Sequence, residues 1–406
     1  MALIVMKFGG TSVANVERIK NVARQAIAKK KAGNDVVLVA SAMAGVTDKL
    51  IGYLNELTPD HNLREYDQMV STGETSNVPL IAQAIISAGE AAESFTGVQA
   101  GIQTNNSHSK ARVVRIDTAN LKRALGEGKI CVVAGFQGYD PASGNITTLG
   151  RGGSDTTAVA LAAALKADKC EIYTDVDGVY TADPRIVKDA KKLDVISHEE
   201  MLELASLGAK VLVSRCVELG MTHDIDIMVL SSLEDKQGTL VTSKLGGRNM
   251  ENLVISGITS DKNQAKIVVS GLPDKVGTAS KLFTELADAN INIDVIVQNA
   301  TRNELSDISF TVQKNELVRA KNVCDVAANR VGAKVHADEN IAKVSIVGVG
   351  ITSNVGVAAT MFRVLAEHAI NIQMISTSDI KISCVIDEKF AEVAVRSLHD
   401  AFITGK

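Results

Sequence analysis

The stretch "MKFGGTSVANVERI", Met6 to Ile19, carries paired glycines between an apolar run and a helical pattern. A strand that passes through such a turn into a helix is the unit of α/β architecture, and the glycines let backbone N–H groups approach an anion. The spacing is neither GxxxxGK[ST] nor GxGxxG, and Lys7 precedes the glycines. The stretch therefore predicts an α/β fold with an anion-binding turn, or else merely a tight turn with a solvent-facing lysine.

Short apolar runs alternate with helical patterns over residues 1–245. This alternation predicts a mainly parallel sheet that is covered by helices on both faces. Thr11 or Ser12 is expected to cap the first helix, and Ser154 a later one. The strands are expected at 3–8, 35–41, 130–136, 170–176 and 225–231.

An internal repeat follows this α/β half. "VGTASKLFTELADANINIDVI" (276–296) matches "VGVAATMFRVLAEHAINIQMI" (355–375) at an offset of 79 residues. Each copy reads strand, helix, strand, strand, helix, which is the order of a ferredoxin-like α+β unit. The strand expected at 252–258 has no partner in the first copy, and the second copy lacks a last strand, so one unit is inserted in the other.

These patterns give the following expected domain boundaries. Residues 1–245 form the α/β domain, 246–252 a linker, and 253–406 the tandem units. The first unit, about 264–340, is inserted in a second unit made of 253–260 and 341–406.

Composition excludes several classes of function. The 406 residues are 46% apolar and 22% charged with a net charge of -4, which lacks the basic excess of a nucleic-acid-binding protein. No apolar run approaches the ~18 residues that span a bilayer, and the start lacks the features of a signal peptide. Five scattered cysteines and seven histidines favour a reducing cytoplasm and argue against structural zinc.

Other motifs combine glycines with charged and hydroxyl side chains. "LGRGGSDTTA" (149–158) provides Arg151, a fork for a carboxylate, together with Ser154 and Asp155 at a helix start. "STGETS" (71–76) adds Glu74, an acid that is out of place near phosphates unless a cation, such as a substrate ammonium, lies opposite. Solvated loops are the plain alternative for both motifs.

A third cluster, "YTDVDGVYTADPR" (173–185), packs turn residues behind a strand. It lacks the glycine and closing glutamate positions of a calcium loop, so a nucleotide-edge loop is the better functional interpretation. In "SLGAKVL" (206–212), Lys210 is either a second phosphate-binding cation or a surface lysine.

In this order, "KFGGTSV", "SAMAGVT", "STGE", "GRGGSDTTA" and "TDVDGVYTADPR", followed by two fused repeats, resemble the bacterial aspartokinases over the whole chain. The resemblance implies the three-layer αβα sandwich of the amino-acid-kinase fold, with a mainly parallel sheet, and two ferredoxin-like ACT units. It also implies phosphorylation of L-aspartate by MgATP to 4-phospho-L-aspartate, the first step toward lysine, threonine and methionine.

The resemblance also assigns residues to roles. Catalysis would depend on Lys7, Arg151 and Asp155. ATP would be contacted by Lys7, Phe8, Gly9, Gly10, Ser41, Thr174, Asp175, Tyr180, Asp183, Arg185 and Lys210. Aspartate would be contacted by Thr47, Glu74, Arg151, Gly152 and Ser154. No side-chain metal ligand is assigned, because Mg²⁺ would be held mainly through the phosphates.

Lysine, threonine or both would inhibit by binding to the ACT units, which would also form at least a homodimer. The implied effector contacts are Asp274, Gly277, Ala279, Asn292, Asp294, Gln298, Asn299, Met374, Ile375 and Thr377. Ser353 stands where the second repeat should match Asp274, which favours one composite pocket with "STSD" (376–379) over two equivalent pockets. The alternatives are repeats that only dimerise, a glutamate or acetylglutamate kinase, and a catalytically silent amino-acid sensor.

Overall fold

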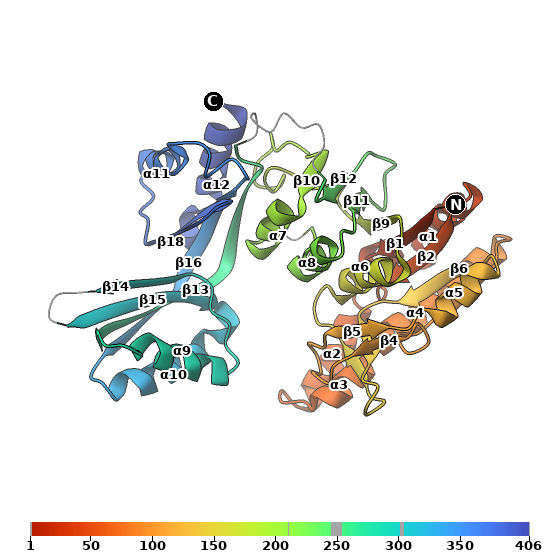
Figure 1. Ribbon diagram of the computed structural model, residues 1–406, viewed down its shortest axis with the longest axis horizontal. Helices are drawn as coiled ribbons and strands as arrows, with labels where there is room; N and C mark the ends of the chain where they lie inside the picture. The colour runs from red at the N-terminus through yellow and green to blue at the C-terminus, as the bar shows by residue number, and fades with distance from the viewer. Residues whose placement is uncertain (1, 210, 245–253, 301–303, 406) are drawn as a thin grey trace. The chain divides into compact units, whose positions relative to one another are not determined.

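The computed structural model describes residues 2–209, 211–244, 254–300 and 304–405 (Figure 1). The chain divides into two compact units. Unit 1 comprises Met1–Val179, Lys192–Ser206 and Lys210–Arg248. Unit 2 comprises Tyr180–Lys191, Leu207–Ala209 and Asn249–Lys406. No helix among the described residues is both long enough and apolar enough to cross a membrane.

Unit 1 is built on an eight-stranded sheet of order β10-β12-β11-β9-β1-β2-β6-β3. Neighbouring strands pair in parallel except β11 with β12. The strands are β1 Leu3–Phe8, β2 Asp35–Ala40, β3 Ala92–Phe95, β6 Ile130–Ala134, β9 Lys169–Thr174, β10 Val195–Ser197, β11 Ile227–Ser231 and β12 Thr239–Thr242. The five expected strands are all present, most of them slightly shorter than expected.

Helices cover both faces of this sheet. Helices α1 and α4 share one apolar core with β1, β2 and β6, whereas α6 packs on β1, β9 and β2 with α8 beside it. The expected αβα sandwich is therefore confirmed. The helices of unit 1 are α1 Val16–Lys31, α2 Val46–Leu57, α3 Leu63–Val70, α4 Thr72–Ser87, α5 Ala119–Gly126, α6 Gly153–Leu165, α7 His198–Ser206 and α8 Ser214–Thr222.

The expected helix caps are wrong. Thr11 and Ser12 lie in a short 3-10 helix, η1 (Gly10–Val13), and the cap of α1 is Asn15, whose side chain accepts a hydrogen bond from the Arg18 amide. Helix α6 starts one residue before Ser154, with Gly152 at the cap in a left-handed conformation. The glycine-rich turns therefore place their hydroxyl residues inside the first helical turn, where they can face a ligand.

A second, four-stranded sheet in unit 1 was not expected from the sequence. Its order is β5-β4-β7-β8, and its strands are only three or four residues long. They are β4 Ile102–Thr104, β5 Val113–Ile116, β7 Gln137–Tyr139 and β8 Ile146–Thr148. Strand β8 leads directly into the loop that carries Arg151.

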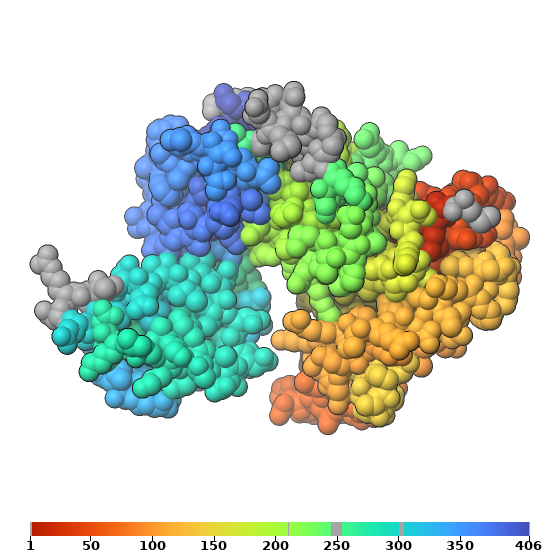
Figure 2. All heavy atoms as spheres, viewed as in Figure 1, coloured from red at the N-terminus to blue at the C-terminus, as the bar shows by residue number. Residues whose placement is uncertain are grey.

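Unit 2 is an antiparallel six-stranded sheet of order β14-β15-β13-β16-β18-β17. The strands are β13 Gly257–Pro273, β14 Ile296–Ala300, β15 Leu305–Gln313, β16 Lys334–Val347, β17 Met374–Ser378 and β18 Lys381–Asp387. The helices are α9 Thr278–Asp288, α10 Leu317–Asn329, α11 Val357–Glu367 and α12 Ala391–His399, with short 3-10 turns η2 Lys314–Glu316 and η3 Glu388–Phe390 and a π turn η4 Asp400–Thr404. Outer faces of α9 and α11 lie at the surface (Figure 2).

The two repeats share the long strands β13 and β16. The first part of β13 pairs with the end of β16, from Gly257 opposite Val347 to Asp261 opposite Lys343. The second part pairs with the start of β16 and with β15. Helices α9 and α10 cover one apolar core and α11 and α12 another, so the two α+β units are confirmed. The linker 246–252 lies outside the described residues, and the exact domain boundaries stay predictions.

Candidate active site

Lys7 and Asp155 form the centre of the site in unit 1. Lys7 lies near the end of β1, and Asp155 lies on the first turn of α6. The Lys7 Nζ atom is 2.5 Å from Asp155 Oδ1, and each side chain is only 11% exposed. A Cβ atom added to Gly9 would be 3.5 Å from Lys7 Nζ, so the ammonium group lies beside the glycine turn. The carboxylate therefore orients the cation toward the turn that the sequence predicts to bind an anion.

The glycine turn packs closely on the loop after β2. A Cβ atom on Gly10 would approach Ala42 O to 2.9 Å, so only glycine allows this contact. The Ser41 amide donates to Phe8 O at 3.2 Å, which brings Ser41 to the turn as expected. The Phe8 ring is buried and stacks on Tyr173 at 4.5 Å between ring centroids. Phe8 can therefore offer a ligand only its backbone.

Glu74 is a buried residue of α4, and only one of its carboxyl oxygens makes a hydrogen bond among the described residues. Its side chain accepts a hydrogen bond from the Ala42 amide at 3.2 Å, whereas its Oε2 atom has no hydrogen-bond partner among the described residues. Burial raises the pKa of Glu74 to about 7. Thr47 lies nearby, because its Oγ1 atom is 3.7 Å from a Cβ atom added to Gly73. The arrangement suits a bound cation.

The loop before α6 presents Arg151. Arg151 is exposed, and Gly152 after it has a φ angle of 72°. A Cβ atom on Gly152 would lie 2.1 Å from Val213 Cγ1, so the loop conformation requires glycine there. Ser154 is buried, and its Oγ atom is 2.7 Å from a Cβ atom added to Gly135 at the end of β6. The loop and the helix start are thus held tightly against the sheet.

A buried network that the sequence did not reveal supports this loop. Asp67 on α3 is fully buried and accepts hydrogen bonds from His108 Nδ1 at 2.7 Å, the Ser109 amide at 3.0 Å and Thr148 Oγ1 at 2.5 Å. Thr148 ends β8, just before the Arg151 loop. These three partners lie 41, 42 and 81 residues from Asp67 in the chain, so no local spacing could have identified them.

The expected nucleotide contacts fall in both units. In unit 1, Thr174 ends β9 and Asp175 follows it, and Thr174 Oγ1 donates to Asp175 Oδ1 at 3.0 Å. Tyr180, Asp183 and Arg185 belong to unit 2, in the stretch Tyr180–Lys191. Arg185 pairs with Asp183 at 2.7 Å while its side chain is 83% exposed. Lys210 lies outside the described residues.

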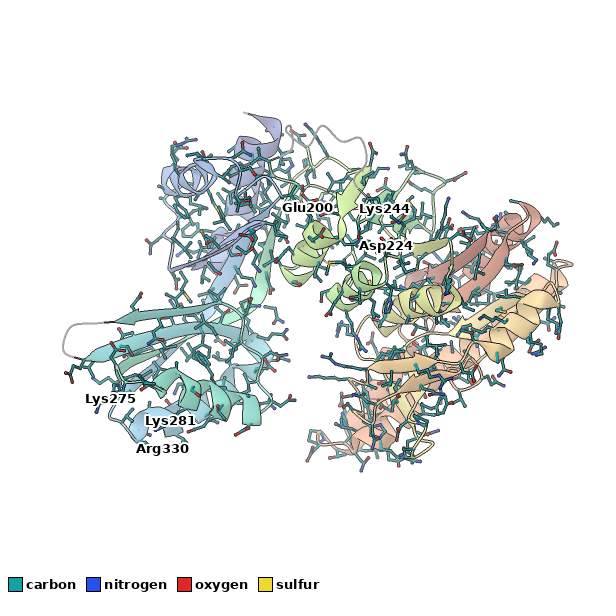
Figure 3. The ribbon with its side chains drawn as sticks, in the orientation of Figure 1. Glu200, Asp224, Lys244, Lys275, Lys281 and Arg330 are labelled. Carbon is teal, nitrogen blue, oxygen red and sulfur yellow. The ribbon has the colours of Figure 1, made fainter. Side chains whose placement is uncertain are left out.

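The expected effector residues lie around α9 and on the two edge strands of the unit 2 sheet. Asp274 is exposed in that loop, Gly277 caps α9 with a φ angle of 92°, and Ala279 follows on the helix. Lys275 lies in this loop, and Lys281 lies on the first part of α9 (Figure 3). Asn292 and Asp294 lie in the loop after α9, where Asp294 pairs with the buried Lys343.

The remaining effector residues lie on the two outer strands. Gln298 and Asn299 are on β14, and Met374, Ile375 and Thr377 are on β17. These strands are the opposite edges of the sheet, yet they contact each other, and Met374 shares an apolar cluster with Val295. The curvature of the sheet therefore brings residues of the two repeats together.

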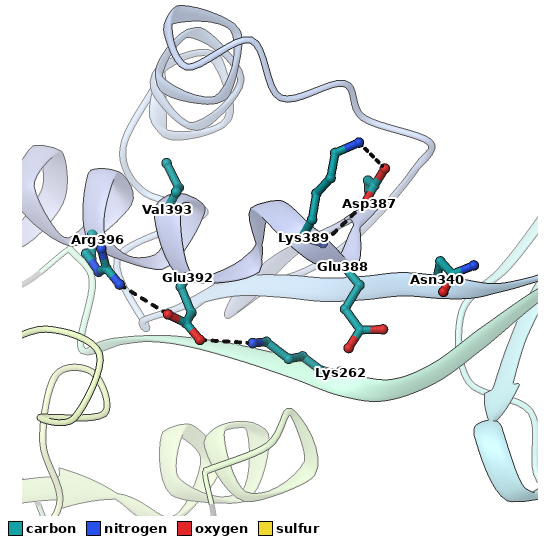
Figure 4. Close-up of a pocket in the computed structure, with 8 residues that line it drawn as sticks. All are labelled: Lys262, Asn340, Asp387, Glu388, Lys389, Glu392, Val393 and Arg396. Carbon is teal, nitrogen blue, oxygen red and sulfur yellow. Dashed lines mark hydrogen bonds and ion pairs between the residues drawn. The ribbon is translucent and has the colours of Figure 1, made fainter.

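One pocket of unit 2 is separate from these residues. It has a volume of about 660 Å³ and lies between β13, β16 and α12 (Figure 4). Its cations are paired with its acids, as Lys262 and Arg396 both bind Glu392, and Lys389 binds Asp387. This pairing leaves the pocket without an excess of charge for an ionic ligand.

The sequence pattern of the amino acid kinase family matches residues 2–231, and that of the ACT domain matches residues 266–327 and 344–402. The first match covers more than half of the chain. Together with the αβα sandwich and the glycine turn, the matches define the class of protein as an amino acid kinase with C-terminal ACT domains.

Full-length relatives narrow this class. The chain is 52% identical to an aspartokinase of Pseudomonas aeruginosa over 99% of its own length and 98% of the relative's, and 48% identical to an aspartokinase of Mycolicibacterium smegmatis over 100% and 97%. E. coli aspartokinase III in complex with aspartate and ADP has a TM-score of 0.82 at 27% identity, covering 98% and 99% of the chains. The chain belongs to the aspartokinase family, as the resemblance of its motifs indicated.

Proposed function

We propose that this protein is an aspartate kinase, which transfers the terminal phosphoryl group of ATP to the side-chain carboxylate of L-aspartate and yields 4-phospho-L-aspartate and ADP. This reaction is the first step of the lysine, threonine and methionine pathway. Relatives named aspartokinase at about 50% identity over the whole chain support it. The observation that carries it is that unit 1 holds both a cation for phosphate and an acid for an ammonium group. The cation is Lys7, which lies beside the glycine turn, and the acid is the buried Glu74, whose Oε2 atom has no hydrogen-bond partner among the described residues.

The chemistry requires no general base. A carboxylate nucleophile is already ionised at neutral pH, so the obstacle is repulsion between two anions. Catalysis then depends on positioning and on positive charge. Lys7, oriented by Asp155, stabilises the phosphoryl group in transfer together with the amides of the glycine turn and Ser41, which follows β2.

Five residues bind the amino acid. The guanidinium of Arg151 and the hydroxyl of Ser154 bind the α-carboxylate of aspartate, with Gly152 giving the loop its shape. Glu74 binds the ammonium group, and Thr47 assists it. This set selects an amino acid with free amino and carboxyl groups over an acetylated one. A catalytically silent sensor would not need the Lys7–Asp155 pair, so the presence of the pair favours an active kinase.

ATP enters this scheme with Mg²⁺. Among the described residues no group of three or more His, Cys, Asp or Glu side chains could hold a metal ion. Mg²⁺ prefers phosphate oxygens and water to an all-protein cage, and we propose that the ion would be held mainly through the phosphates of ATP. When bound, the ion neutralises phosphate charge. Thr174, Asp175, Tyr180, Asp183, Arg185 and Lys210 are the proposed nucleotide contacts of the chain.

A hydroxylamine trap for acyl phosphate tests the reaction. We expect a hydroxamate signal with MgATP and L-aspartate, and little or none with L-glutamate or N-acetylglutamate. A signal that is larger with glutamate would establish a different amino acid kinase, and no signal with any acceptor would establish the silent sensor. Arg151→Ala should then raise the KM for aspartate while the KM for ATP stays the same.

Regulation and assembly complete the proposal. Lysine, threonine or both bind the effector residues of unit 2 and inhibit the kinase, as the structure of E. coli aspartokinase III in complex with lysine and aspartate suggests.

Val276 and Val355, at equivalent positions of the two repeats, are 109% and 107% exposed. Such apolar side chains favour burial in a homodimer of ACT units. All five cysteines are buried free thiols, which suits the cytoplasm.

A further inference from the structure

Residues Tyr180–Lys191, here called the 180–191 segment, directly follow a kinase motif but belong to the core of unit 2. The chain leaves unit 1 after Val179 and returns to it at Lys192. Within unit 2, apolar residues of the segment pack in the same cluster as β16, β18, α11 and α12. These residues are Ala182, Ile186, Val187 and Ala190. The segment is therefore folded as part of the regulatory unit.

Hydrogen bonds close the segment into a hairpin. The Leu193 amide donates to Val179 O at 2.8 Å, and the Thr181 amide donates to Lys191 O at 2.9 Å. The hydroxyl of Thr181 accepts from the Lys191 amide at 2.9 Å, and Thr181 O accepts from the Ile258 amide of β13 at 2.8 Å. Thr181 thus joins the two arms of the hairpin to the unit 2 sheet.

Helix α12 holds the hairpin at two points. His399 Nε2 lies 2.9 Å from Thr181 Oγ1, and both residues are buried. Burial lowers the pKa of the His399 ring, which favours the neutral imidazole, and its Nε2 atom shares a hydrogen bond with the Thr181 hydroxyl whose direction depends on the histidine tautomer. One turn earlier, Arg396 Nε donates to Ile186 O at 3.1 Å. Glu392 fixes the Arg396 guanidinium at 3.1 Å and is itself paired with Lys262 (Figure 4).

We propose that α12 positions the nucleotide contacts: through His399 and Arg396 it holds the 180–191 segment, and with it Tyr180, Asp183 and Arg185, in the ATP-binding conformation. The inference rests on the proposed function, which makes these three residues ATP contacts. His399 and Arg396 are then positioning residues for the reaction, although they lie in the regulatory unit. Any rearrangement of that unit that loosens α12 should weaken ATP binding and spare aspartate binding.

Two variants on the contacts and two matched controls test this role. Thr181→Val removes the hydroxyl at nearly constant volume, and Arg396→Met removes the bond to Ile186. The controls are Arg363→Met, which removes an equivalent arginine paired with Glu367 on α11, and His368→Leu, at the end of the same helix. We expect the first two to raise the KM for ATP about tenfold, the effect of a lost hydrogen bond that holds the segment, with the KM for aspartate within twofold. The controls should change neither.

Hydrogen–deuterium exchange gives a readout that does not need activity. In the wild type, a non-hydrolysable ATP analogue with Mg²⁺ should slow amide exchange in peptides covering 178–193. In Arg396→Met, whose side chain is half exposed and should not impair folding, exchange there should be faster without nucleotide. An unchanged KM for ATP in both variants overturns the proposal, even if exchange becomes faster. If the wild type phosphorylates aspartate but the analogue does not protect 178–193, the proposal also fails while the proposed function stands.

Discussion

Among single side chains, Glu74 connects burial to pH dependence. Its pKa, raised from 4.5 to about 7 by burial, leaves it mostly protonated at pH 6. A neutral carboxyl cannot pair with the ammonium group of aspartate, so the KM for aspartate should fall about tenfold per unit as pH rises toward 7 and then level off. Initial rates between pH 5.5 and 8.5 measure this. Glu74→Gln should have a high KM that no longer follows pH in this range.

The raised pKa of Glu74 also predicts how the stability of the fold changes with pH. Because its pKa is higher in the folded protein, Glu74 binds a proton more tightly there than in the unfolded chain. The stability that this proton gives is fully present below the unfolded pKa of 4.5 and is lost as pH rises through about 7. The wild type should therefore lose stability in this window relative to Glu74→Gln in thermal melts. A KM for aspartate that is independent of pH in the wild type would contradict the proposed role of Glu74.

Lys7 is the residue on which phosphoryl transfer should depend most. Lys7→Ala should reduce kcat on the order of 10²–10³-fold, because it removes one preorganised charge from the transition state. Lys30→Ala is the matched control, since Lys30 pairs with Asp35 at 3.0 Å away from the glycine turn. Steady-state kinetics that show a nearly normal kcat for Lys7→Ala would refute the role.

At the level of helices, strands and loops, the Arg151 loop should tolerate no side chain at Gly152. Gly144→Ala is the control, because Gly144 has a similar φ angle of 71° but open space around it. The control should cost about 1 kcal/mol for the left-handed backbone alone. Gly152→Ala should cost about 2–4 kcal/mol, since the overlap with Val213 adds to the strain.

Denaturant unfolding measures both variants. Val213→Ala in the Gly152→Ala background should recover part of the loss, because it removes the overlapping methyl groups. Equal losses of stability in Gly144→Ala and Gly152→Ala would show that the close packing of the loop does not matter.

The sequence predicted the elements that bury apolar residues on both faces. Strands β1, β2, β6, β9 and β11 are runs of apolar residues in a parallel sheet, and such runs are visible without tertiary information. Strands β4, β5, β7 and β8 were missed because three or four residues, several of them polar, form a strand only when a neighbour pairs with them. The first helix start was misplaced because Asn15, not a hydroxyl residue, provides the cap.

The candidate site divides in the same way. Lys7, Glu74, Arg151 and Asp155 stand in recognisable motifs, and the structure places Lys7 against Asp155. Their supports do not stand in motifs. The Asp67 network and the 180–191 segment depend on contacts between residues that are far apart in the chain, and no periodicity or spacing in the sequence encodes such contacts.

Over the whole molecule, the duplicated regulatory half is not equivalent in its two copies. Asp274 in the first repeat corresponds to Ser353 in the second, at the same point before the capping glycine. Both side chains are exposed, so replacing either should leave the core intact. At a helix N-terminus, the backbone amides can bind the carboxylate of an amino acid while a nearby acidic side chain binds its ammonium group.

This asymmetry predicts which copy senses the effector. Asp274→Ala should retain kinase activity within about twofold and lose inhibition by lysine and threonine, because the effector stabilises an inactive state only through contacts that differ between states. Ser353→Ala should keep both activity and inhibition. Dose–response curves with lysine alone, threonine alone and both together measure this. Inhibition that persists in Asp274→Ala but is lost in Ser353→Ala would place the sensing pocket in the second repeat.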